Sequence, residues 1–119
     1  MALQAGMALG WWVALVVSAR VRGWFELDAG EHDALSAFAL ADLLVIVAGS
    51  AVAALALARS WSWASSCVAW VAGGVAYATL YLAMWTVLGG HGAAGLAPMA
   101  GATVLTSGVA IRETRDAAS

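Results

Sequence analysis

One apolar stretch with a single acidic residue inside it constrains this chain more than any other feature. The stretch covers residues 35–59, and Asp42 is its only ionisable side chain before the closing Arg59. A helix needs about 20 apolar residues to cross a bilayer, and this stretch is long enough. A carboxyl group within such a helix costs at least about 2.5 kcal/mol. The stretch therefore predicts a membrane-spanning helix in which Asp42 faces protein or water and has a function there.

The composition of the whole chain also indicates a membrane protein. Of its 119 residues, 64% are hydrophobic and 10% are charged, whereas ordinary soluble domains carry about 25% charged residues. A spanning helix with its connection uses about 25 to 30 residues, so we expect four helices in one domain over residues 1–119. The predicted fold is all-α, an integral-membrane bundle of four transmembrane helices with both termini on the same side.

Polar and glycine-rich breaks divide the chain into the four expected helices. Gly89 and its neighbours up to Gly92 form one such break, and a polar tail that frays is expected from Arg112 onwards. The expected helices cover residues 2–19, 35–58, 63–88 and 94–111, with a polar outer loop over residues 20–34.

The arginines predict an orientation. Arg59, Arg112 and Arg115 flank one expected end of the bundle, and Arg20 and Arg22 flank the other. Arginine and lysine accumulate in cytoplasmic loops. The count therefore favours both termini in the cytoplasm, and the composition of the chain suggests a bacterial cytoplasmic membrane.

Charge and cysteine content exclude several classes of function. The net charge is −2 and the five basic residues are all arginines, so no basic patch is expected and nucleic acid is excluded as a partner. Cys67 is the only cysteine, which excludes redox chemistry by a thiol pair. Adjacent helical residues point about 100° apart, so Glu31, His32 and Asp33 cannot chelate an ion together. We expect no metal and no cofactor.

The candidate site lies at the end of the bundle that holds the polar loop and the loop around His91. Asp42 is expected about two turns below this end on the second helix, with Tyr81 and Tyr77 at similar depths on the third. Such positions between helices are typical of ligand sites in bundles. The predicted catalytic residues are Asp42, Tyr81, Tyr77, Glu26, Asp28 and Glu31, and the predicted substrate-binding residues are Trp12, Phe38, Trp70, Trp85, His91 and His32.

A carboxyl group among phenols and indoles favours acid/base chemistry on an apolar, isoprenoid- or lipid-like substrate. Isomerisation, cyclisation and epoxide opening all begin with proton transfer, and aromatic rings stabilise a carbocation that follows. In this hypothesis Asp42 is the acid or base, a tyrosine is its partner, and an acid of the polar loop is the second carboxylate.

Two other functions remain open. The chain is also consistent with a proton-coupled transporter or channel in which Asp42 titrates, and four short helices would then assemble as a homo-oligomer through small residues such as Gly6 and Gly10. It is also consistent with an accessory subunit of a larger membrane complex. In a purely structural role, Asp42 would hydrogen-bond Tyr77, Tyr81 or a threonine.

Overall fold

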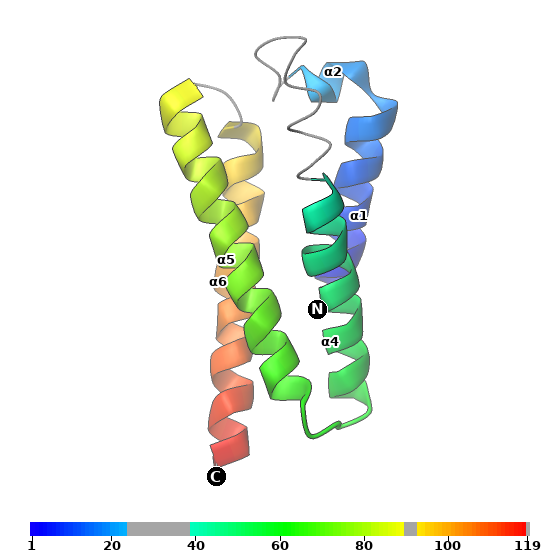
Figure 1. Cartoon of the computed structure of the whole chain (residues 1–119), viewed down its shortest axis with the longest axis vertical. Helices are drawn as coiled ribbons and strands as arrows, with labels where there is room; N and C mark the ends of the chain where they lie inside the picture. Colours follow the sequence, from blue (N-terminus) through cyan, green and yellow to red (C-terminus); the bar gives the residue numbers. More distant parts are fainter. Residues whose placement is uncertain (24–38, 90–92, 119) are drawn as a thin grey trace.

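The computed structural model describes residues 1–23, 39–89 and 93–118, and the described residues contain helices and turns without any strand (Figure 1). The prediction of an all-α fold is therefore confirmed for this part of the chain. The helices are α1 (Ala2–Val17), α2 (Ala19–Arg22), the π-helical segment η2 (Leu43–Ala48), α4 (Gly49–Ala58), α5 (Ala64–Gly89) and α6 (Ala93–Ala118). Residues 39–42 are helical and lead into η2, so that Ala39–Ala58 is one continuous helix.

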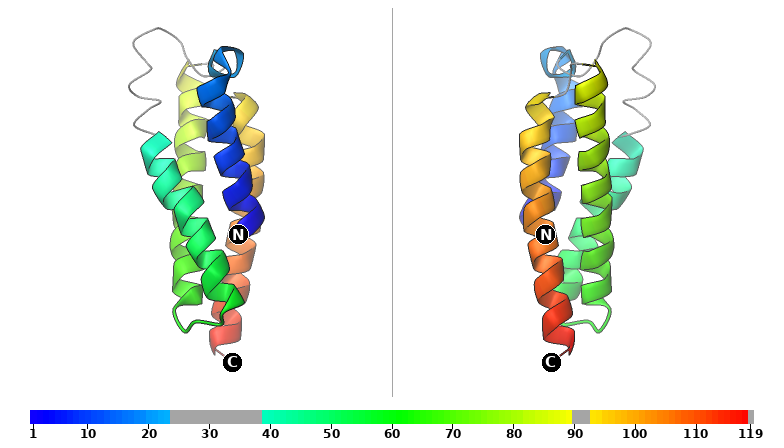
Figure 2. Two further views of the ribbon diagram at one scale, coloured as in Figure 1. Left: turned by 90° about the vertical axis from the view of Figure 1, so that its right-hand side faces the viewer. Right: turned by 90° about the vertical axis from the view of Figure 1, so that its left-hand side faces the viewer.

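The helices run roughly along the long axis of a molecule that measures 51 × 26 × 18 Å. Helices α5 and α6 lie side by side, helix Ala39–Ala58 packs on α5, and α1 packs on η2 and α4 (Figures 1 and 2). Because α1 has 16 residues and α6 has 26, they are about 24 and 39 Å long. The N-terminus consequently lies midway along the bundle, whereas the C-terminus lies at the end that holds the α4–α5 turn.

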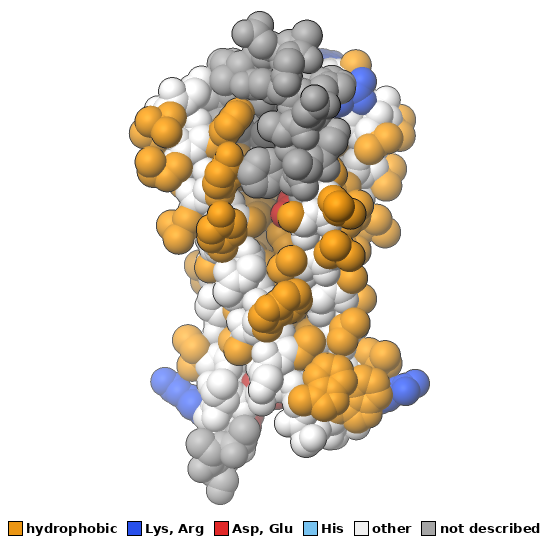
Figure 3. Space-filling model, viewed as in Figure 1, with side chains coloured by type: hydrophobic (Ala, Val, Ile, Leu, Met, Phe, Trp, Pro, Cys, Tyr) orange, Lys and Arg blue, Asp and Glu red, His pale blue; other side chains and the backbone are white. Residues whose placement is uncertain are grey.

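Two of the described helices, Ala39–Ala58 and α5, are long and apolar enough to cross a membrane. Helix α1 is apolar but shorter, and α6 ends in a charged segment. Large hydrophobic side chains cover the outer surface between the two ends, and basic side chains lie near the ends (Figure 3). Membrane crossing by all four helices remains a prediction.

The core forms where α5 meets helix Ala39–Ala58. Val68, Val71 and Val75 are fully buried at the three- and four-residue spacing of one helical face. They pack with Ile46 and Ala53 of the neighbouring helix.

Two glycines allow these helices to approach closely. A Cβ atom added to Gly49 would lie 3.1 Å from a methyl group of Val71, and one added to Gly74 would lie 2.5 Å from Cγ1 of Val45. The interface therefore depends on the absence of side chains at both positions, as in other close helix pairs.

The helix ends differ from the expected ones at two places. Ser18 has an extended backbone that ends α1 at Val17, and the Arg22 guanidinium donates hydrogen bonds to the carbonyl oxygens of Leu15 and Val16 at 2.9 and 2.7 Å. These bonds satisfy carbonyl groups that a helix end leaves free. Helix α6 continues past Ile111 to Ala118.

The added turns of α6 have local support. The Arg112 guanidinium lies 3.7 Å from the carboxylate of Asp116, the four-residue spacing at which opposite charges favour a helix. The Thr114 hydroxyl donates to the carbonyl oxygen of Ala110 at 3.0 Å. The chain after Ile111 therefore forms helix where a frayed tail was expected.

Candidate functional site

Asp42 is a half-buried residue of the first described turn of helix Ala39–Ala58. The indole of Trp12 in α1 is a hydrogen-bond partner of its carboxyl group, and Trp12 itself is only 9% exposed. Within the described ranges, Arg112 forms an ion pair with Asp116. All five arginines belong to these ranges, and none forms an ion pair with Asp42.

The π-helical segment η2 begins directly after Asp42. A π-helix replaces the usual bonds by bonds between residues five apart, and short π segments occur frequently at functional sites. The first described residues of the apolar stretch therefore combine a half-buried acid with an irregular helix. Sequence periodicity predicts a regular helix here and does not reveal the π segment.

The antiparallel packing of α5 sets the height of its aromatic residues relative to Asp42. Gly49 lies opposite Trp70, and Val45 lies opposite Gly74. When this register is extended by about one helical turn beyond Gly74, Tyr77 lies at the same height along the bundle as Asp42.

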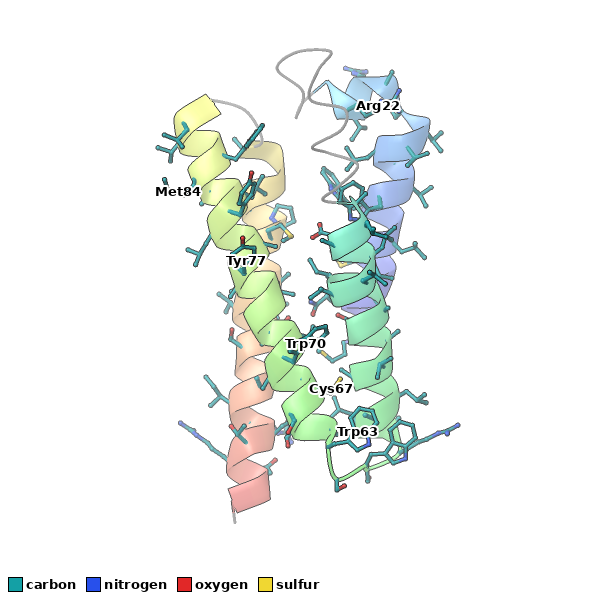
Figure 4. The ribbon with its side chains drawn as sticks, viewed as in Figure 1. Arg22, Trp63, Cys67, Trp70, Tyr77 and Met84 are labelled. Atoms are coloured by element: carbon teal, nitrogen blue, oxygen red, sulfur yellow. The ribbon has the colours of Figure 1, made fainter. Side chains whose placement is uncertain are left out.

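Tyr77 nevertheless does not join Asp42. Its side chain is 70% exposed and that of Trp70 is 60% exposed, and no hydrogen bond links Tyr77 to Asp42 in the described structure. Figure 4 shows both aromatic side chains along α5, and Trp70 lies beside α4. The interior face of α5 is occupied by valines, because compact side chains let the helices approach more closely than indoles or phenols do.

Tyr81 and Trp85 form an aromatic pair one to two turns above Tyr77. Their ring centroids are 6.3 Å apart and the ring planes are inclined by 23°, which is a stacked arrangement within the range of favourable aromatic pairs. Tyr81 is 39% exposed. The structure thus brings these two predicted residues together on one side of α5.

Half of the predicted site residues lie outside the described residues. These are three acids of the polar loop, both histidines and one phenylalanine: Glu26, Asp28, Glu31, His32, His91 and Phe38. The second carboxylate of the predicted acid/base pair accordingly stays a prediction.

Sequence reasoning missed a polar seam in the middle of the bundle. The hydroxyl groups of Thr79 and Thr103 are 2.7 Å apart and join α5 to α6. The hydroxyl of Thr106 donates to Oε1 of Gln4 at 2.7 Å and joins α6 to α1. The three-residue spacing of the two α6 threonines, and a glutamine in an otherwise apolar first helix, are the sequence signals that point to it.

Comparisons of the chain with protein-family models, with curated proteins and with solved structures found no match. The site is therefore interpreted from the chemistry of its own residues.

Proposed function

We propose that this chain is a four-helix integral-membrane protein in which Asp42 and Trp12 form a site for an isoprenoid- or lipid-like molecule, with Asp42 acting on it as acid or base. The observation that carries the proposal is the half-buried carboxyl group with an indole partner and no arginine paired to it. Ionisable groups within spanning helices are costly and usually functional. An acid retained there without an arginine paired to it is best explained by a chemical function.

The Trp12 indole suits the role of a positioning group. An indole N–H is a hydrogen-bond donor only, so it holds the carboxyl group in one orientation and cannot take its proton. The remaining oxygen lone pairs of Asp42 stay available to a ligand. A ring that is itself 9% exposed has little freedom to move away.

The surroundings favour an apolar ligand. Apolar side chains such as Leu43 and Leu44 flank Asp42 on its own helix and are exposed on the outer surface, where a molecule dissolved in the bilayer would approach. The Tyr81–Trp85 pair offers aromatic surface on the neighbouring helix. Isomerisation, cyclisation and epoxide opening by proton transfer all fit such a site.

The experiment is native mass spectrometry of the purified protein, followed by lipid extraction and identification of the bound molecule. We expect one isoprenoid- or sterol-like molecule on the wild type. Asp42→Asn keeps the shape of the side chain but removes the acid, so it should abolish turnover of the identified molecule while the protein stays folded. Unchanged turnover by a folded Asp42→Asn protein would contradict the proposal.

A proton-coupled transporter is a second candidate, and the polar seam favours it. Two hydrogen bonds between side chains, Thr79–Thr103 and Thr106–Gln4, place polar groups in the middle of the bundle. The test is proton uptake by liposomes that contain the protein and a trapped pH-sensitive dye. Flux that Asp42→Asn abolishes, without any bound ligand in the wild type, would favour transport over the enzyme.

A further inference from the structure

A tight turn between α4 and α5 holds its side chains in a defined arrangement. Helix α4 ends at Ala58, Arg59 is its C-cap residue, and Ser60 follows with φ 51°, in the left-handed region. The backbone N–H of Ser60 donates to the carbonyl oxygen of Leu57 at 3.1 Å, and that of Trp61 donates to Ala56 at 3.0 Å. These two bonds define a Schellman motif. The directions in which Arg59 and Trp61 leave the helix are therefore set by the backbone.

Arg59, Trp61 and Trp63 form one cluster on this turn. The guanidinium carbon of Arg59 lies 5.6 Å from the centroid of the Trp61 ring, within the range of a cation–π interaction. The Trp61 and Trp63 rings have centroids 5.0 Å apart. Both rings are partly exposed, at 36% and 45%.

Arg59 keeps its charge available for an external anion. Among the described residues it makes no ion pair, while Arg112 at the same end of the molecule is paired with Asp116. Stacking on an indole leaves the N–H groups at the edge of a guanidinium free to bind, and their fork matches two phosphate oxygens.

The position of the cluster along its helix matches the headgroup level of a bilayer. Helix Ala39–Ala58 has 20 residues, which is about 30 Å and equals the usual thickness of the hydrocarbon core. Arg59 follows it directly. Tryptophan is enriched at this level, where its ring contacts acyl chains and its N–H faces the headgroups.

We infer that Arg59, Trp61 and Trp63 form a binding site for the phosphate of an anionic phospholipid in the leaflet that faces the α4–α5 turn. The inference rests on the membrane insertion in the proposed function, but not on Asp42. The guanidinium binds the phosphate, the two indoles hold the adjoining glycerol and acyl region, and the Schellman motif keeps the three side chains in place. The site is thus a specific lipid contact that anchors this end of the bundle.

The test compares binding of phosphatidylglycerol and phosphatidylcholine with identical acyl chains to the full-length protein, by native mass spectrometry. We expect the wild type to prefer phosphatidylglycerol and Arg59→Gln to lose about tenfold of its affinity for that lipid, as loss of a charge-assisted hydrogen bond implies. Arg115→Gln is the matched control. It removes the same charge from the same end of the molecule, at an exposed residue, and should keep the preference.

Several outcomes would overturn the inference. Equal affinities of the wild type for the two lipids would show that the anionic headgroup is not recognised. Equal losses in Arg59→Gln and Arg115→Gln would leave only a general charge effect. Displacement of the lipid by millimolar inorganic phosphate would indicate a site for free anions instead.

Failure of the lipid-binding site and failure of the proposed function can be distinguished by these experiments. A lipid preference that persists while Asp42→Asn leaves turnover unchanged would refute the chemistry at Asp42 and retain the headgroup site. The reverse result would retain the chemistry and refute the headgroup site.

Discussion

Replacing Gly74 by alanine tests the close approach of α5 to helix Ala39–Ala58. The new Cβ atom would lie 2.5 Å from Cγ1 and 3.9 Å from Cβ of Val45. Carbon atoms pack best at about 3.5 to 4.0 Å, so the pair must separate by about 1 Å or more. Valine is confined to one side-chain rotamer in helices, and its methyl group cannot turn away. The two helices must therefore move apart.

The magnitude follows from two opposing effects. Forcing an extra carbon into a packed interface costs about 1 to 3 kcal/mol, and the short distance to a rigid methyl group places this case at about 3. Alanine in place of glycine within a helix contributes about 1 kcal/mol of stability. We therefore expect Gly74→Ala to lower the free energy of unfolding by about 2 kcal/mol.

Gly73 provides the control because it is the adjacent residue in the same helix. A Cβ atom there would meet nothing within 4 Å, so Gly73→Ala should be neutral or stabilising by up to about 1 kcal/mol. The helix-propensity effects are alike in both variants, and the difference between their unfolding free energies therefore isolates the clash at about 3 kcal/mol.

The assay is reversible unfolding in mixed detergent micelles, followed by circular dichroism. Val45→Ala removes the methyl group that Gly74→Ala would meet, and the double variant should recover most of the loss. Equal stabilities of Gly74→Ala and Gly73→Ala, or no recovery in the double variant, would refute the packing described for α5.

Three further predictions concern single contacts. Ser60→Gly should stabilise the α4–α5 turn by about 1 kcal/mol in the same unfolding assay, because glycine adopts a left-handed conformation without strain; a loss of stability would contradict the turn geometry. A double-mutant cycle of Thr79→Val and Thr103→Val should give a coupling energy of about 0.6 kcal/mol, and additive effects would show that the hydroxyl groups do not interact. Trp12→Phe keeps an aromatic ring but removes the donor to Asp42, so it should reduce the amount of bound ligand in native mass spectrometry, whereas full retention would exclude a positioning role for Trp12.

The sequence by itself predicts the helical class and much of the interface on helix Ala39–Ala58. Its apolar length exceeds that of any strand, and Ile46, Gly49 and Ala53 recur at the three- and four-residue spacing of one helical face, which is the buried side in the structure. The sequence also singles out Asp42, because it is the only acid in that apolar run. These conclusions need only local periodicity and the cost of burying charge.

Only the tertiary structure decided which face of α5 is buried and which groups meet across helices. In α5 the valine face and the aromatic face are both apolar, and lipid tails are as apolar as a protein core, so hydrophobicity cannot choose between them. The shape of the side chains determines which face is buried. Val71 and Val75 pack against helix Ala39–Ala58, which contains Gly49, and Tyr77 lies on the outside. The partnership of Trp12 with Asp42 likewise depends on how α1 packs on η2, and no periodicity within one helix encodes a contact between two.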